Sequence, residues 1–161
     1  MLQQSYRILL GLACACDILV IDLLSKYFLF EPGIAFSFFG GFIKHVIHQN
    51  SGLIANLPLP QPIIIVMTFC FLMVFIFWWF TCLSRSPLVT QISAGMVLGG
   101  ALGNVVDRVM LGFVRDWILV FDRSAMNIAD IAIVLGTISL FFFVRSMPAR
   151  ENDVQGKNPP A

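Results

Sequence analysis

Charged residues are scarce in this chain of 161 residues. Asp, Glu, Lys and Arg make up 12% of it, whereas a soluble globular domain carries about 25%. The formal net charge is only +1, which excludes the strongly basic surface of a nucleic-acid-binding protein. Hydrophobic residues account for 58% of the chain, which is more apolar surface than a water-soluble domain of this length can bury. The lipid bilayer must therefore be part of the solvent of this protein.

Residues that typically bind metals or act as nucleophiles are also few. The four cysteines all lie inside apolar segments, where they are more typical of packing than of a zinc site or a disulfide framework. The two histidines, His45 and His48, are three residues apart in a loop, and this spacing alone is insufficient for a metal site. We therefore expect no metal and no other cofactor, and we interpret both histidines as surface residues.

Four segments of the chain are long and apolar enough to cross a membrane, which takes roughly 20 residues. They cover residues 8–30, 63–83, 88–111 and 126–144, and a long loop over residues 31–62 separates the first two. The sequence predicts an all-α membrane protein with four transmembrane helices. We expect one membrane domain over residues 1–147 and a flexible polar tail over residues 148–161.

The basic residues predict which ends of the spans face the cytoplasm. With four spans, both termini lie on the same side of the membrane, and cytoplasmic loops carry the excess of Lys and Arg. The terminal side has a small excess of these residues. That side carries Arg7, Arg85, Arg145, Arg150 and Lys157, and the other side carries Lys44, Arg108, Arg115 and Arg123. We therefore expect cytoplasmic termini.

Two ionisable residues near the end of the first span lie on one helical face. Asp22 and Lys26 are four residues apart, with the acid N-terminal to the base. An ionisable group inside a span costs about 3 kcal/mol and usually faces the protein interior or a wet cavity. The pair either neutralises the helix end for insertion or helps to shape a polar site near the membrane surface. Asp17 lies deeper and has no local partner.

The third span ends with three polar residues on one side of the helix. Asn104, Asp107 and Arg108 follow at i, i+3 and i+4, a spacing that projects them from the same face. Helix packing does not require an acid, an amide and a guanidinium at one place. The same span carries a row of glycines that permits close approach of another helix: Gly95, Gly99 and Gly103.

More polar residues follow the third span. Asp116 interrupts an apolar stretch, and the fourth span opens with Asn127 and Asp130, spaced i, i+3. Because the third and fourth spans run antiparallel, the end of one and the start of the other meet at the same membrane surface. Asp107, Asp116 and Asp130 are thereby gathered at one depth, and this layer predicts a functional site.

Two neighbouring carboxylates are a known catalytic arrangement. They cannot both ionise easily, so they share a proton and titrate as a coupled pair. One carboxylate can activate a water as a general base while the protonated one donates to the scissile carbonyl oxygen, as in aspartic proteases. The spacing of the three acids does not decide which two would form the pair.

The chain resembles the bacterial lipoprotein signal peptidases, or signal peptidase II. Four stretches carry the resemblance, in order along the chain, with a weaker match at Asn50-Ser-Gly52 in the first loop. They are residues 22–26 (DLLSK), 99–108 (GGALGNVVDR), 112–116 (GFVRD) and 127–130 (NIAD). The third-span block and the Asn-x-Ala-Asp motif are the most specific of these.

The resemblance implies an activity and assigns roles to the polar residues. It implies an aspartyl endopeptidase that cleaves diacylglyceryl-modified prolipoproteins before the lipid-bearing cysteine, with Asp116 and Asp130 as the catalytic pair. The other polar residues would bind substrate or organise the site. These are Asp22, Lys26, Asn50, Gly52, Asn104, Asp107, Arg108 and Asn127. Asp107 would be a supporting acid that orients Arg108 or the adjacent amides.

The resemblance also implies a location and partners. We expect a monomer in the bacterial inner membrane, in contact with membrane lipids and prolipoprotein substrates but not with nucleic acid. Its first loop would form a small extracytoplasmic β-like cradle. One departure is Arg115, which stands where the family usually has an apolar residue and, as a neighbouring cation, could favour ionisation of Asp116.

Two other classes of function fit the residues less well. A proton or ion relay would use the aspartates and Lys26 as its path, but a relay should extend across the bilayer, whereas these acids cluster at one surface. A divergent relative could also bind lipidated substrates without cutting them. Asp17 is the one acid whose depth favours a relay.

Overall fold

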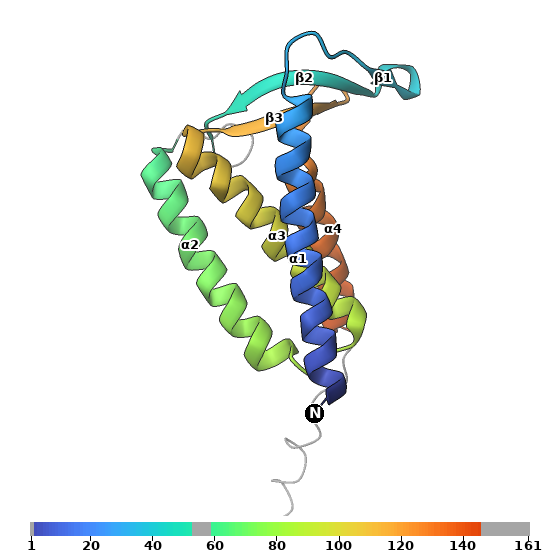
Figure 1. The fold of residues 1–161 in the computed structure, drawn as a ribbon, viewed down its shortest axis with the longest axis vertical. Helices are drawn as coiled ribbons and strands as arrows, with labels where there is room; N and C mark the ends of the chain where they lie inside the picture. Colours follow the sequence, from blue (N-terminus) through green and yellow to red (C-terminus); the bar gives the residue numbers. More distant parts are fainter. Residues whose placement is uncertain (1, 53–58, 146–161) are drawn as a thin grey trace, which may run out of the picture.

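The computed structural model describes residues 2–52 and 59–145, which form a helix bundle with a small sheet across one end (Figure 1). Residues 53–58 of the first loop and the tail predicted over residues 148–161 lie outside the described residues. The elements are α1 (Leu2–Leu29), β1 (Ser37–Phe38), η1 (Phe39–Gly41), β2 (Ile43–Asn50), α2 (Gln61–Trp78), η2 (Trp79–Leu83), α3 (Leu88–Leu111), β3 (Val114–Val120), β4 (Ser124–Met126) and α4 (Ile128–Arg145).

Three helical segments in the described residues are long and apolar enough to cross a membrane: Gln3–Leu29, Gln61–Leu83 and Leu88–Leu111. They confirm three of the four predicted spans and make this a multi-pass membrane protein. The fourth predicted span, residues 126–144, differs at its start. Ser124–Met126 pairs with β3 as a strand, so α4 begins only at Ile128 and its apolar part, Ile128–Phe143, is shorter than the others.

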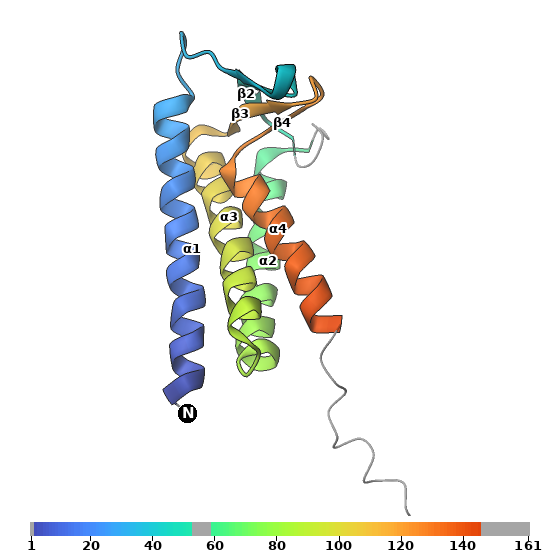
Figure 2. The ribbon, with the colours of Figure 1, turned by 90° about the vertical axis from the view of Figure 1, so that its right-hand side faces the viewer.

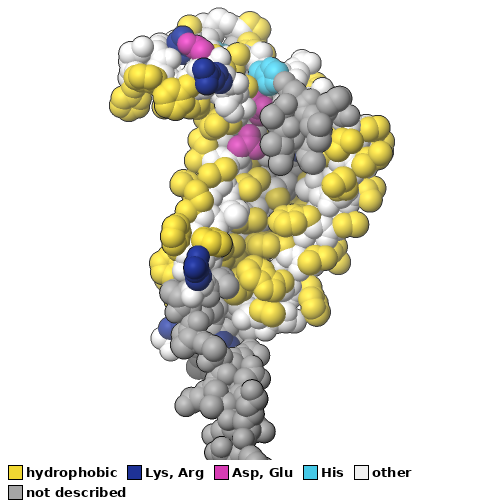
Figure 3. Space-filling view, turned by 180° about the vertical axis from the view of Figure 1, so that it is seen from behind, with side chains coloured by type: hydrophobic (Ala, Val, Ile, Leu, Met, Phe, Trp, Pro, Cys, Tyr) yellow, Lys and Arg dark blue, Asp and Glu magenta, His cyan; other side chains and the backbone are white. Residues whose placement is uncertain are grey.

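The outer surface of the bundle is apolar, as expected for a protein surrounded by lipid. Large hydrophobic side chains are exposed along α2, including Val66, Met73, Val74 and Phe77. Figure 3 shows hydrophobic side chains over most of the helical surface on one face of the molecule. A water-soluble monomer rarely exposes so large a contiguous apolar area, so this surface supports the membrane assignment.

Helix α3 lies at the centre of the bundle. In its most apolar window 72% of residues are buried, compared with 17% in the first span and 22% in the second. The predicted close approach at the glycine row is confirmed: a Cβ added at Gly95 or Gly99 would collide with the backbone of α1, and one at Gly100 would lie 2.5 Å from the carbonyl oxygen of Ala129 in α4. Small residues therefore let two helices contact α3 backbone to backbone.

The sheet has four antiparallel strands in the order β1-β2-β3-β4. The prediction of a β structure built from the first loop is only partly right, because β3 and β4 come from the segment between α3 and α4. Gly112 makes this possible: its left-handed backbone, with φ 80°, ends α3, and a glycine adopts this conformation without steric cost. The chain then turns directly into β3, beneath β2.

Candidate active site

The predicted site residues come together where the sheet covers one end of the bundle, opposite the N-terminus (Figure 2). Asp116 on β3 has no solvent exposure in the structure. Its two carboxylate oxygens accept separate hydrogen bonds, one from Nδ2 of Asn127 at 2.7 Å and one from Nδ2 of Asn50 at 3.0 Å. Asn50 at the end of β2 and Asn127, which directly precedes α4, therefore hold this carboxylate in place.

Asp130 occupies the first turn of α4 and is partly buried. Its carboxylate accepts hydrogen bonds from Nδ2 of Asn104 at 2.8 Å and from the backbone N–H of Asn127 at 3.3 Å. In return, the Asn127 side-chain oxygen accepts the backbone N–H of Asp130 at 2.9 Å. This reciprocal exchange has the form of a capping box, and the N-terminal end of the helix dipole favours a negative charge there.

Asn127 connects the two acids. Besides its bond to Asp116, its amide nitrogen donates to Oδ1 of Asn104 at 3.1 Å, and Asn104 in turn donates to Asp130. The side chain of Asn127 is fully buried, and such a buried amide is strongly constrained because each of its polar atoms requires a partner. The two carboxylates are thus separated and oriented by a pair of amides.

Burial, and after it the negative charge of Asp130, raise the pKa of Asp116 from its ordinary value of 3.8 to about 6. The hydrogen bonds from Asn50 and Asn127 and the charge of His48 act in the opposite direction and limit this rise. Removal from water disfavours the ionised carboxylate, and a second carboxylate nearby acts in the same direction. A carboxyl group near this pKa can hold or release a proton around neutrality, as acid–base catalysis requires.

Lys26 is the centre of a second, fully buried part of the cluster. Its Nζ lies 2.7 Å from Oδ2 of Asp22 and 3.2 Å from Oδ2 of Asp107. It also donates to Oδ1 of Asn104 at 3.1 Å. The other oxygen of Asp22 accepts the backbone N–H of Ala129 at 2.9 Å, so this acid also holds the first turn of α4. The predicted pair in the first span is therefore part of the site.

Asp107 was expected to orient Arg108 or the adjacent amides, and the structure places Arg115 beside it in addition to Lys26. Nη2 and Nε of Arg115 lie 2.7 and 3.2 Å from Oδ1 of Asp107, and the backbone N–H of Arg115 donates to its Oδ2 at 3.0 Å. Arg115 therefore does not act as the direct counter-ion of Asp116 that the sequence suggested. Neighbouring residues of a strand point to opposite faces, so Arg115 and Asp116 face different surroundings.

Arg108 belongs to the side of the cluster that includes the first loop. Its Nη2 donates to the carbonyl oxygen of Gly52 at 3.1 Å and its Nη1 to that of Asn104 at 3.5 Å. The backbone N–H of Gly52 donates to Oδ1 of Asn50 at 3.1 Å. All ten residues that the sequence singled out are thus connected in one network. Figure 3 shows acidic side chains, with a histidine beside them, in a recess between the sheet and the helices.

Sequence reasoning missed several contacts of this network. His48 lies directly across from Asp116 in the β2–β3 pairing, and Nε1 of Trp117 donates to Oγ of Ser25 at 3.2 Å. His45, interpreted as a surface residue, lies 2.6 Å from the carbonyl oxygen of Leu29 through its Nε2. The strand register decides these contacts, and no short motif in the sequence indicates it. Asp17 is exposed on α1, away from the cluster.

Comparison with protein families gives a match. Residues 14–145 match a sequence model described as signal peptidase (SPase) II. The lipoprotein signal peptidase of Acinetobacter baumannii strain ATCC 17978 is 34% identical over 147 residues, which cover 83% of this chain and 72% of that protein. The lipoprotein signal peptidase of Moorella thermoacetica is 31% identical over 151 residues, which cover 92% and 98%.

Two solved structures of bacterial membrane enzymes, both obtained by the in meso method, have a similar fold. One superposes with a TM-score of 0.75 at 21% sequence identity and covers 94% of this chain and 93% of its own. The other has the same TM-score at 23% identity and covers 86% and 94%. The arrangement of helices and sheet described above is therefore shared with known membrane enzymes.

Proposed function

Because this chain belongs to the signal peptidase II family of peptidases, we propose that it is an aspartyl endopeptidase in which Asp116 and Asp130 activate a water. Membership in this family supports the removal of signal peptides from prolipoproteins as the activity of this chain. The main support for the proposed mechanism is the position of Asp116. It is a fully buried acid, held by Asn50 and Asn127 and linked to Asp130 through amides.

The proposed reaction needs one water and the two carboxyl groups, which share one proton before the reaction. The ionised carboxylate takes a proton from the water, whose oxygen attacks the carbonyl carbon of the scissile peptide bond. The protonated carboxyl donates to the carbonyl oxygen, and the tetrahedral intermediate forms. When the C–N bond breaks, the nitrogen takes a proton from the pair while one hydroxyl of the intermediate returns a proton to it, so the pair again holds one proton and the products are a carboxylic acid and an amine. The two acids titrate as one unit, so the roles of base and acid belong to the pair.

The remaining residues of the cluster would position the substrate and hold the acids. Arg108 and Asn50 both contact Gly52, so they would fix the first loop beside the acids and present polar groups to the substrate backbone. Asp22, Lys26 and Asp107 form a buried ionic group behind Asn104. This group would keep the Asn104 amide aimed at Asp130, because precise placement of catalytic groups contributes much of the rate of an enzyme.

The substrate we propose is a diacylglyceryl-modified prolipoprotein, cut before the lipid-bearing cysteine by a monomeric enzyme of the bacterial inner membrane. We propose four membrane spans, cytoplasmic termini and an extracytoplasmic cradle that includes the sheet. The 18 residues of α4 lie at the short end of the 17–25 that span a bilayer. The acids lie at the sheet end of the bundle, where a lipid anchor would present the cleavage site.

A proton or ion relay is the weaker alternative. Its path would have to continue from the cluster toward the other membrane surface. Within residues 2–52 and 59–145, the contacts of the cluster described above extend along α1 only as far as Asp22, and Asp17 is exposed. A protein that binds lipopeptides without cleaving them would have the same residues. Only an activity assay therefore distinguishes it from the proposed peptidase.

The test is cleavage of a synthetic diacylglyceryl-lipopeptide by the purified protein. We expect Asp116→Asn and Asp130→Asn each to abolish cleavage while the protein still inserts and folds. Asp122→Asn is the matched control, because Asp122 is an exposed acid of the same sheet end that pairs with Lys44 at 2.8 Å. Full activity in either of the first two variants would refute the proposed pair. Cross-linking to the lipopeptide without product in the unmodified protein would instead support the binder.

A further inference from the structure

A β-bulge in β2 decides which side chain lies opposite Asp116. His45 of β2 pairs with Ile118 of β3, and the next pair beyond the irregularity is His48 with Asp116. These two pairs are three residues apart on β2 but only two apart on β3, so β2 carries one extra residue between them. In a regular ladder the apolar Ile47 would lie opposite Asp116. Bulges next to active sites re-aim a side chain, and this one brings an imidazole to the acid.

The side chain of His48 lies on the face of β2 that is turned toward Asp116. Residues two apart on a strand point to the same face, and Asn50, two residues after His48, donates to Asp116 at 3.0 Å. Directly opposite residues of two antiparallel strands have Cβ atoms about 5 Å apart. His48 is half-buried, so its ring also reaches water. A positive charge on this ring therefore acts on the Asp116 carboxylate at short range.

The hydrogen bonds of Asp116 leave His48 a role through its charge. Each carboxylate oxygen of Asp116 already accepts an amide N–H, one from Asn127 and one from Asn50. Histidine is the side chain that ordinarily gains a positive charge between about pH 5 and pH 8, and an opposite charge nearby favours an ionised carboxylate. Burial is the main cause that raises the pKa of Asp116, and the charge of His48 opposes it.

The other charged groups around Asp116 do not change their charge in this pH range in the same way. On the elements that surround it, they are Asp130 on α4, Arg108 on α3 and Arg115 on β3. Arginine stays protonated in proteins, and Arg115 is held by Asp107. The two residues of β1, on the other side of β2, are Ser37 and Phe38. Among the described residues, His48 is therefore the cation beside Asp116 that titrates near neutrality.

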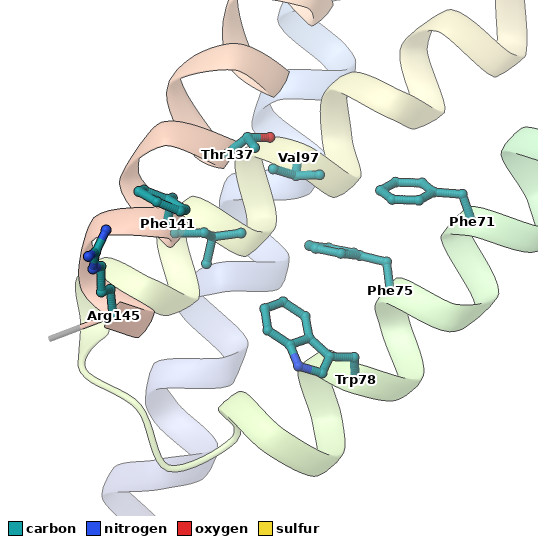
Figure 4. Close-up of a pocket in the computed structure, with 8 residues that line it drawn as sticks. Phe71, Phe75, Trp78, Val97, Thr137, Phe141 and Arg145 are labelled. Atoms are coloured by element: carbon teal, nitrogen blue, oxygen red, sulfur yellow. The ribbon is translucent and has the colours of Figure 1, made fainter. Parts of the chain in front are cut away.

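The bundle side of the acids borders an apolar groove between α2, α3 and α4 (Figure 4). Its volume is ≈ 600 Å³, and its walls include Phe75, Val97 and Thr137. Thr137 follows Asp130 by seven residues on α4, about two helical turns, so the groove is part of the same site. An apolar segment bound there excludes water from this side of the acids, which makes an ionised carboxylate more costly. A compensating charge on the sheet side then matters more.

We propose that His48 is a positioning residue of the peptidase site, whose protonated ring lies beside the Asp116 carboxylate and stabilises its ionised form. The inference rests on the proposed function, because it concerns the acids that activate the water. In acid solution the ring gains its charge and biases the shared proton of the pair toward Asp130, so Asp116 stays available as the general base. His48 acts through Asp116 and exchanges no atom with the substrate.

The experiment measures kcat/KM for cleavage of the diacylglyceryl-lipopeptide by the full chain from pH 4.5 to pH 8. His48→Gln removes the charge, so we expect the acidic limb of the profile to move to higher pH by about 0.5 to 1, less than a fully buried ion pair would give. Cleavage at pH 5.5, relative to that at pH 7.5, should then fall about three- to tenfold. His48→Lys stays charged over the whole range and should return the limb to its original pH or lower.

The matched control moves the imidazole by one residue without changing the composition of the chain. Gln49 follows His48 on β2 and is exposed, and neighbouring residues of a strand point to opposite faces. A double variant with His48→Gln and Gln49→His therefore carries its ring on the face turned away from Asp116. Its pH profile should remain that of His48→Gln alone.

An acidic limb that stays in place in His48→Gln would overturn the proposal, as would recovery of the limb by the ring on the opposite face. A higher KM with an unmoved limb would assign His48 to substrate binding instead, which also overturns it.

A second measurement tests the link between His48 and Asp116 without any cleavage. Unfolding temperatures are compared for the unmodified chain, His48→Gln, Asp116→Asn and the variant with both changes. The two changes should be non-additive at pH 6 and additive at pH 8, where histidine is ordinarily neutral. Additivity at both pH values would refute the electrostatic role of His48. Cleavage by Asp116→Asn would refute the proposed peptidase mechanism but leave this result unaffected, so the two can fail separately.

Discussion

The side-chain nitrogen of Asn127 lies 2.7 Å from the carboxylate of Asp116. Asn127 precedes the first residue of α4, and it also exchanges two hydrogen bonds with Asp130 in the first turn of that helix. The residue that starts the helix is therefore the one that sets the position of both acids. Asn127 therefore caps α4 and also positions Asp116, and substitutions at this residue can separate the two roles.

Replacing Asn127 by serine tests this separation. Serine is a good N-cap residue, but it is too short to donate to Asp116 as the amide does. We expect Asn127→Ser to keep most of the stability and to lose about 10- to 100-fold in the specific rate of lipopeptide cleavage, in keeping with the effect of misplaced catalytic groups. Asn127→Ala should lose the rate as well as about 1 kcal/mol of stability. Unchanged cleavage in both variants would show that the amide has no part in the mechanism.

The pH dependence of cleavage should reflect the raised pKa of Asp116. Activity that needs one ionised acid in the pair should fall below a pKa near 6, the value that burial and Asp130 give Asp116. Asn50→Ala removes a hydrogen bond that lowers this pKa, so the acidic limb of the rate profile should move to higher pH. The measurement is kcat/KM from pH 4.5 to pH 8 in one buffer series. A shift to lower pH would contradict the assigned role of the hydrogen bond.

The same pKa shift makes stability depend on pH. Because the pKa of Asp116 is raised on folding, from 3.8 to about 6, the native state holds the proton more tightly than the unfolded state does. Stability therefore decreases as pH rises from about 4 to about 6, and above that range the loss is on the order of 3 kcal/mol.

We expect the thermal unfolding temperature of Asp116→Asn to exceed that of the unmodified protein at pH 7.5 and to approach it at pH 4. Asp122→Asn, which changes an exposed acid with 61% of its side chain accessible, should show no such pH-dependent difference. If the unfolding temperature of Asp116→Asn stays below that of the unmodified protein at pH 7.5, the ionised Asp116 carboxylate does not destabilise the fold and the prediction is wrong.

Arg115 should stabilise the site through Asp107 rather than through Asp116. The buried residues Asp22, Lys26 and Asp107 form, with the half-buried Arg115, a group of two acids and two bases. Arg115→Leu leaves this group with a net negative charge, and we expect a loss of about 1–3 kcal/mol. The excess negative charge should also move the acidic limb of the cleavage profile to higher pH.

A second substitution tests whether the effect passes through the ion pair. Asp107→Asn combined with Arg115→Leu restores neutrality, so the double variant should be more stable than the sum of the two single changes implies. The comparison uses unfolding temperatures and pH profiles of all four proteins. Simple additivity would mean that the two side chains act independently.

The glycine row should tolerate no larger residue. Gly99 of α3 faces the backbone of Ala15 in α1, where an added Cβ would collide. Gly99→Ala should therefore push α1 away from α3 and cost about 1–3 kcal/mol. Ala13→Val on the exposed side of α1 adds comparable bulk toward lipid and should have little effect. Equal unfolding temperatures for the two variants would disprove the close approach.

Much of the site was predictable because its residues lie on single helices. The spacing of Asn104, Asp107 and Arg108 puts all three on one side of α3 whatever surrounds the helix. The antiparallel order of α3 and α4 brought Asp130 to the same level. The resemblance to a family was needed to choose Asp116 and Asp130 as the pair, because depth alone does not distinguish them from Asp107.

The prediction failed where a strand replaced an expected loop. Residues 112–126 were expected to be a connection and the opening of a span, but they form β3 and β4. Val114, Trp117 and Ile118 of β3 are buried because this strand lies between β2 and β4 in the sheet and also contacts α1 and α3. Hydrophobic runs of this length do not distinguish a short buried strand from the end of a helix.

The sequence by itself determined that this protein is embedded in a membrane and that its polar residues lie in one layer. Composition, segment length and helical spacing are local quantities, and they do not depend on how the helices pack. Only the tertiary structure decided which polar side chain pairs with which acid. Arg115 binds Asp107 and Asn127 binds Asp116 because the β2–β3 register and the close α1–α3 contact orient these side chains, and both result from pairing between segments far apart in the chain.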